Sequence, residues 1–105
     1  MQKVKITVIR KSFNQDLVER HLAEEEKGKF GPCETFQVGQ EFIVEGWPAK
    51  PEGFCDWAWL DIQRVVGIAA FGGQVEGTRP KNAWPVGCTD ALRPVAFLVE
   101  PIGEP

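Results

Sequence analysis

Tyrosine is absent from this chain, histidine and methionine occur once each, and no hydrophobic run is long. The longest apolar run, residues 65–73, has nine residues, whereas a helix that spans a bilayer needs roughly 20. Lys and Arg number 12 against 15 Asp and Glu, so the chain lacks the basic surplus of a protein that binds nucleic acid. Residues 1–12 mix charged with apolar side chains, unlike a signal peptide. We therefore expect a cytoplasmic protein with neither nucleic acid nor a membrane as its partner.

Cysteine is also scarce, with single thiols at positions 33, 55 and 88. Three cysteines are an odd number and do not form the dense set of disulfides that is typical of small secreted domains. This cysteine content agrees with a reducing compartment. The chain of 105 residues is long enough for one hydrophobic core and too short for two, so residues 1–105 are expected to form a single domain.

The stretch from Pro51 to Gly73 is the longest one with helical periodicity. Pro51 and Gly53 end any preceding strand, Cys55 or Asp56 can cap a first turn, and the glycine pair at 72 and 73 ends the helix. Apolar residues recur at spacings of three and four, which predicts one buried face made of Ala58, Ile62, Val65, Val66 and Ala69. Cys55 lies on nearly the same stripe, so its thiol is expected to point inward or into a cleft beside the core.

The chain before this helix contains a predicted strand, a helix and a hairpin. Residues 3–10 alternate between apolar and polar side chains, which predicts a strand with one buried face. Ser12 and Gln15 have the spacing of a capping box and precede a predicted helix over about residues 13–27. Residues 34–38 and 41–45 also alternate, and Gly39 with Gln40 predicts the turn of a hairpin between them.

After the long helix, residues 74–87 are polar and contain two prolines, so they are interpreted as a mobile loop. The apolar run 95–99 predicts a central strand. The order strand, helix, hairpin, helix, strand predicts an α+β fold: a split β-α-β (ferredoxin-like) sandwich with two helices on one face of an antiparallel sheet. The alternative is a small, partly closed β-barrel with a plugging helix.

The three cysteines each lie where a turn meets a regular element, and such junctions can converge at one end of a sheet. Cys55 opens the long helix, where the N-terminal dipole favours a thiolate, although Asp56 beside it acts in the opposite direction. Cys55 is therefore the candidate catalytic residue. The alternative is packing, because free cysteine often behaves as a small buried hydrophobe.

A metal-binding interpretation uses Cys33, Cys55 and Cys88 as ligands, with Asp90 or His21 as the fourth. Against it, the cysteines are 22 and 33 residues apart and form no Cys-x-x-Cys pair, the usual way in which one turn presents two ligands. His21, the only histidine, is also a candidate general base for Cys55. The alternative is that His21 lies at the edge of the first predicted helix, where Glu25 would hold it.

The four tryptophans predict an aromatic pocket around the central thiol, because Trp57 and Trp59 follow Cys55 closely. Trp59 is expected to lie over Cys55, and Trp57 is expected to face the loop that carries Trp84. The alternative is that at least two of the four indoles fill the core. Asp90 and Arg93, three residues apart, are candidates for orienting a ligand carboxylate or for pairing with each other.

Two segments, PEGFC-x-WAW at 51–59 and CTD-x-x-RPV at 88–95, carry a resemblance that extends over nearly the whole chain. Together with Cys33 and the hairpin residues 38–42, they resemble a family of small, uncharacterised three-cysteine proteins found largely in anaerobic bacteria and archaea. Relatives tend to have glycine where this chain has Ala91. The resemblance implies that the three cysteines form a recurring set, and it implies no reaction.

These patterns lead to one main functional hypothesis and two alternatives. The main hypothesis is a cysteine-centred, Trp-lined site for thiol redox chemistry, metal binding or small-ligand binding, in which Cys55 reacts and Trp57, Trp59, Trp84, Asp90 and Arg93 contact the ligand. The first alternative is a non-catalytic accessory module that binds a partner protein or a small ligand through its Trp-rich loops. The second is a metal carrier or sensor, whose cofactor would be a cysteine-bound metal.

Overall fold

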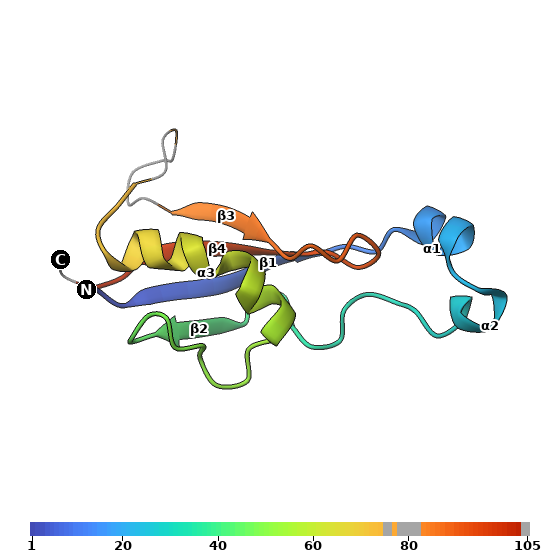
Figure 1. Cartoon of the computed structure of the whole chain (residues 1–105), viewed down its shortest axis with the longest axis horizontal. Helices are drawn as coiled ribbons and strands as arrows, with labels where there is room; N and C mark the ends of the chain where they lie inside the picture. The colour runs from blue at the N-terminus through green and yellow to red at the C-terminus, as the bar shows by residue number, and fades with distance from the viewer. Residues whose placement is uncertain (75–76, 78–82, 104–105) are drawn as a thin grey trace.

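The computed structural model describes residues 1–74, 77 and 83–103. Four strands form one open antiparallel sheet in the order β2-β1-β4-β3 (Figure 1). The strands are β1 (Val4–Lys11), β2 (Glu41–Val44), β3 (Trp84–Gly87) and β4 (Val95–Pro101). The helices are α1 (Gln15–His21), α2 (Glu24–Lys27) and α3 (Asp56–Ala70). The α+β class and the antiparallel sheet are as predicted, and the sheet is open rather than closed into the alternative barrel.

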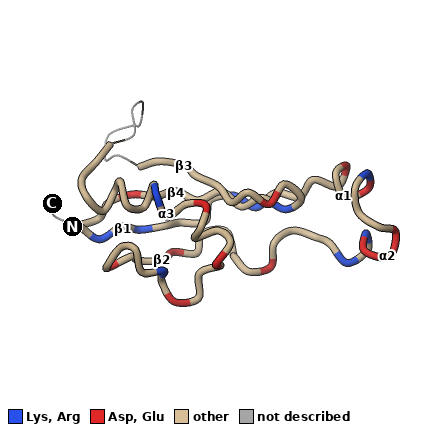
Figure 2. Tube along the Cα trace, viewed as in Figure 1, with Lys and Arg blue, Asp and Glu red and all other residues tan. Residues whose placement is uncertain are grey.

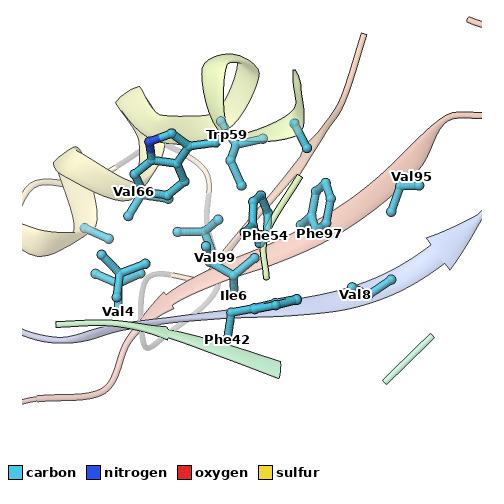
Figure 3. Packing of buried hydrophobic residues seen from close by; sticks show 14 of the residues in the cluster. Val4, Ile6, Val8, Phe42, Phe54, Trp59, Val66, Val95, Phe97 and Val99 are labelled. Atoms are coloured by element: carbon cyan, nitrogen blue, oxygen red, sulfur yellow. The ribbon is translucent and has the colours of Figure 1, made fainter. Parts of the chain in front are cut away.

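One face of the sheet carries the core and is covered by α3 (Figure 3). The alternation in β1 and β4 places Ile6, Phe97 and Val99 on this face, each at most 1% exposed. Helix α3 contributes Ile62 and Val66, which are fully buried. No polar or charged side chain among the described residues is fully buried, so the cohesion of this layer comes from burying apolar surface.

The helix α3 has the predicted bounds and the predicted buried face, with two differences. Val65 is only partly buried, and the buried face also includes Trp59, Gly67 and Ala70. Cys55 is the N-cap residue, with the extended backbone angles φ −65° and ψ 131°, and its side chain makes no capping hydrogen bond.

The predicted helix over 13–27 is two short helices, α1 and α2, separated at Leu22 and Ala23, both of which have extended backbone angles. The capping box is also absent. The backbone N–H of Ser12 donates to Pro94 O at 2.9 Å, and the helix starts after Asn14. Residues 12–14 instead prolong the β1–β4 ribbon, because the backbone N–H of Asn14 donates to Leu92 O at 2.8 Å.

Helices α1 and α2 lie beyond the end of the sheet, and only α3 lies on it, which corrects the predicted pair of helices on one face (Figure 1). Because of this placement the molecule measures 51 × 29 × 20 Å. Charges of both signs are found on α1 and α2 (Figure 2). Lys27 pairs with Glu24 within α2 and with Glu19 of α1, and the hydrogen bond that Lys27 donates to Glu24 raises the pKa of Lys27.

The predicted hairpin is absent because its first strand does not form: residues 34–38 are irregular. Phe36 of this segment is nevertheless buried, with its ring 5.1 Å from the rings of both Phe54 and Phe97. The outer edge of β2, with which the predicted first strand would have paired, carries no strand among the described residues. The segment therefore joins the body mainly by burying one side chain rather than by a strand ladder.

The predicted loop 74–87 ends in a strand, because Trp84–Gly87 forms β3. Most of the rest of this interval, residues 75–76 and 78–82, lies outside the described residues. Pro85 has no N–H to donate, and it is accommodated because β3 is an edge strand.

Candidate functional site

A cavity of about 350 Å³ brings together all three cysteines of the chain. We name it the three-cysteine pocket. Its wall is formed by Cys33, Glu34, Thr35 and Phe36 before β2, by Cys55, Trp57 and Ala58 at the start of α3, and by Cys88, Asp90, Arg93 and Val95 around the β3–β4 connection. The sequence left open whether the three cysteine-bearing junctions converge, and the structure brings them to one pocket.

The three thiols are free and only partly buried, and each packs against the edge of the core. Cys88 closes the β3–β4 hairpin: its backbone N–H donates to Val95 O at 3.1 Å, and its Sγ accepts from the N–H of Val95 at 3.4 Å. Within the described residues, no other hydrogen bond to a cysteine sulfur is found. The sulfurs of Cys33 and Cys55 therefore take part in no hydrogen bond within the described residues.

Cys55 and its neighbours form the helix side of the pocket. The acidic neighbour Asp56, which the sequence suggested would oppose a thiolate, is paired with Lys50. Lys50 Nζ also donates to Phe54 O at 2.8 Å, which fixes the ammonium group at the entrance to α3. The local negative charge of Asp56 is thereby offset next to the thiol.

The connection after β3 is tied to α3 through Thr89. Trp57 Nε1 donates to Thr89 Oγ1 at 2.8 Å, and Thr89 Oγ1 in turn donates to Asp61 Oδ2 at 3.0 Å. The backbone N–H of Thr89 donates to the same Asp61 oxygen at 2.7 Å. We refer to Trp57, Asp61 and Thr89 as the Thr89 clamp. It fixes the position of Cys88 relative to the start of α3.

Asp90 and Arg93 form the far wall and contact each other, which matches the pairing alternative from the sequence. Arg93 Nε donates to Asp90 Oδ2 at 3.1 Å. Asp90 Oδ1 accepts from the backbone N–H groups of Leu92 at 3.0 Å and Arg93 at 3.3 Å. The guanidinium Cζ also lies 4.9 Å from the centre of the Phe30 ring.

Two of the predicted tryptophans lie elsewhere. Trp59 is 7% exposed and packs in the core against Phe54, with ring centres 6.1 Å apart, and Trp57 rather than Trp59 lines the pocket. Trp84 opens β3 opposite Val99, four positions along β4 from the pocket residue Val95. At roughly 3.3 Å per residue, this is about 13 Å away. The structure therefore does not bring Trp59 or Trp84 into the wall of the three-cysteine pocket.

His21 lies on α1, is exposed and does not line the pocket, so the structure does not bring it to Cys55 as a general base. Within residues 1–74, 77 and 83–103, no group of three His, Cys, Asp or Glu side chains is arranged to hold a metal ion. Over the same ranges, no helix combines the length and apolar character needed to cross a bilayer.

No family model, curated protein or solved structure matches this chain. The resemblance to the three-cysteine family thus stays a prediction.

Sequence reasoning missed the polar partners of the site. Glu34 and Thr35 line the pocket from a segment interpreted as a strand. Asp61 holds Thr89 from the second turn of α3. A signal for Asp61 was available: it follows Trp57 by four residues, so the two share a helix face. Trp57 also follows the pocket thiol, and this face was therefore a candidate to meet the segment around Cys88.

Proposed function

We propose that the three-cysteine pocket is a site of thiol chemistry on a small bound ligand, with Cys55 as the reacting nucleophile. The observation that carries this proposal is the shared cavity. Three segments separated by 22 and 33 residues each place their single cysteine in the wall of one 350 Å³ space. The lower bound for typical small-molecule pockets is about 300 Å³, so a ligand of modest size fits.

The exposure of the thiols favours function over packing. Free cysteine is among the most buried residue types when it serves only as a small hydrophobe. Here all three cysteines are partly exposed, while the fully buried layer beside them is built from Val, Ile and Phe. Free thiols persist in a reducing compartment, so the proposal includes a cytoplasmic location.

Cys55 is proposed as the nucleophile because its surroundings differ from those of the other two thiols. It occupies the N-cap of a 15-residue helix, where the free N–H groups of the first turn stabilise negative charge that develops on an attacking sulfur. Cys88 instead accepts a backbone hydrogen bond, and Cys33 follows an irregular segment away from any helix end.

Of the three functional hypotheses from the sequence, the cysteine-centred site has the most support, in the form of thiol chemistry on a small ligand. The metal alternative lacks a ligand cluster among the described residues. The accessory-module alternative invoked Trp-rich loops, but Trp57 and Trp59 belong to α3 and Trp84 to β3. Trp47 donates its Nε1–H to Gln63 O at 2.7 Å and packs against α3. The indoles therefore do not form one surface.

The test is timed alkylation of the folded protein with iodoacetamide, followed by peptide mapping by mass spectrometry. We expect Cys55 to be modified first. Modification of Cys55 with the bulkier N-ethylmaleimide should then slow labelling of Cys33 and Cys88, because the adduct fills their common cavity. The Cys55→Ser protein is the control. There the same N-ethylmaleimide pretreatment should slow the labelling of Cys33 and Cys88 less, because no adduct forms at position 55. Labelling of Cys33 or Cys88 ahead of Cys55 would contradict the assignment, and labelling of the three at independent rates would contradict the shared site.

A further inference from the structure

We propose that the three-cysteine pocket selects ligands that carry a carboxylate, and that Arg93 binds this group. The inference rests on the proposed function, because it names the class of molecule that Cys55 would act on. Among the described residues that line the pocket, Arg93 is the only Lys or Arg, and it faces the same space as the three thiols.

The guanidinium of Arg93 is held in place before any ligand arrives. Its Nε–H is fixed by Asp90 Oδ2 at 3.1 Å, and its Cζ lies 4.9 Å from the centre of the Phe30 ring. Asp90 is fixed in turn by the backbone N–H groups of Leu92 and Arg93. A side chain that is already ordered loses less entropy on binding than a mobile one, so this arrangement lowers the cost of binding an anion.

Arg93 keeps donors available for a ligand. A guanidinium has five N–H donors, of which Asp90 takes the one on Nε. Within the part of the chain that the structure describes, no acceptor is found for the four on Nη1 and Nη2. The side chain is 40% exposed. This planar pair of nitrogens matches the two oxygens of a carboxylate better than a lysine ammonium does.

Two acidic residues among those described, Glu34 and Asp90, also line the pocket, and they have different effects on an anionic ligand. The carboxylate of Asp90 is satisfied by three donors from its own turn. Glu34 is exposed at the rim and has no ion pair within the described residues, so it would repel an anionic ligand weakly through solvent. Removing the charge of Glu34 should therefore have the opposite effect to removing that of Arg93.

The experiment compares two reagents of similar size, iodoacetate and iodoacetamide, which differ in having a carboxylate or a neutral amide. In both reactions the Cys55 sulfur attacks the CH₂ carbon, the S–C bond forms, the C–I bond breaks, iodide leaves and the thiol proton passes to solvent. The quantity measured is the ratio of the Cys55 alkylation rates, iodoacetate over iodoacetamide. Using a ratio cancels changes in the intrinsic reactivity of the thiol.

We expect Arg93→Gln to lower this ratio by about fivefold, the size of one partly exposed charge contact. Arg64→Gln is the matched control, because it removes the same charge from an exposed position on α3, about 13 Å along the helix from Cys55. This control should leave the ratio nearly unchanged, and Glu34→Gln should raise it. If Arg93→Gln also alters the iodoacetamide rate, Arg93→Lys gives the second comparison: it keeps the charge and should retain part of the ratio.

The outcomes separate the two proposals. A ratio unchanged in Arg93→Gln, with Cys55 still the first thiol to react, overturns the role of Arg93 and leaves the thiol site standing. An equal loss in Arg64→Gln also overturns it, because the cause would then be overall charge. Wild-type protein in which Cys55 reacts no faster than the other two thiols overturns the proposed function itself.

Discussion

Trp57 and Trp59 are two residues apart on α3, yet their side chains have opposite surroundings. Trp59 is in the core, whereas Trp57 is 62% exposed and donates to Thr89 at the pocket. Helical spacing predicted that Trp59 would lie over Cys55. In the structure Trp57 rather than Trp59 lines the pocket with Cys55, which is the N-cap residue with an extended backbone and so lies outside the regular helical spacing.

Gly67 provides a test of packing at a single residue. A Cβ built on this glycine would lie 2.8 Å from Cε2 of Trp47, so we expect Gly67→Ala to displace the indole. The clash should cost about 1–3 kcal/mol, partly offset by the gain of roughly 1 kcal/mol in helix propensity. The measurement is chemical denaturation monitored by circular dichroism, and we expect a net loss of stability.

The control for Gly67→Ala is the same change made in a Trp47→Leu background. In this background the indole that would clash with the added methyl group is gone. The Gly67→Ala change should therefore become neutral or stabilising there. An equal loss of stability in both backgrounds would mean that the clash with Trp47 is not the cause.

At the scale of elements, the pocket depends on how the β3–β4 connection is held against α3. The two elements are distant in sequence, and the Thr89 clamp joins them through three hydrogen bonds. Cys88 directly precedes Thr89, so any loosening of the clamp should move its sulfur relative to Cys55.

Thr89→Val should release this contact while keeping the shape of the side chain. We expect a loss of about 1 kcal/mol in the free energy of unfolding, because two side-chain hydrogen bonds disappear. Cys88 should be alkylated faster, and the fluorescence of Trp57 should shift to the red as its indole N–H turns to water. Thr7→Val, on the β1 face that carries no helix, is the matched control. If Cys88 labelling is as slow in Thr89→Val as in the wild type, the clamp does not position this thiol.

At the scale of the whole molecule, stability comes from one layer of α3 on one face of the sheet. The cluster combines side chains of β1, β2, β4 and α3 with Phe36 and Phe54 from the connecting segments. An apolar core of this kind needs no metal to fold.

Removal of metal should therefore leave the fold unchanged. Protein purified in excess chelator is expected to show the same circular dichroism spectrum and the same melting temperature as untreated protein. The control is re-addition of zinc or iron to the chelated sample, which should change neither. A random-coil spectrum that zinc or iron restores would show that the cysteines hold a structural metal.

The sequence by itself determined the elements that are recognised from the local spacing of their apolar residues. Period-two alternation identified β1, the apolar run identified β4 as a central strand, and spacings of three and four identified α3 and its buried face. In each case the buried side chains of the element meet the same core, so the local pattern and the tertiary contacts agree.

Only the tertiary structure decided the rest, because the deciding contacts join residues far apart in the chain. Residues 34–38 alternate like a strand, but they do not pair with β2, and only Phe36 is buried, against Phe54 and Phe97 from distant parts of the chain. Pro85 argued against a strand, but β3 lies at the edge of the sheet, where a missing N–H costs nothing. The cysteines converge because the segment before β2, the start of α3 and the β3–β4 connection meet at one place, and no local spacing could determine that meeting.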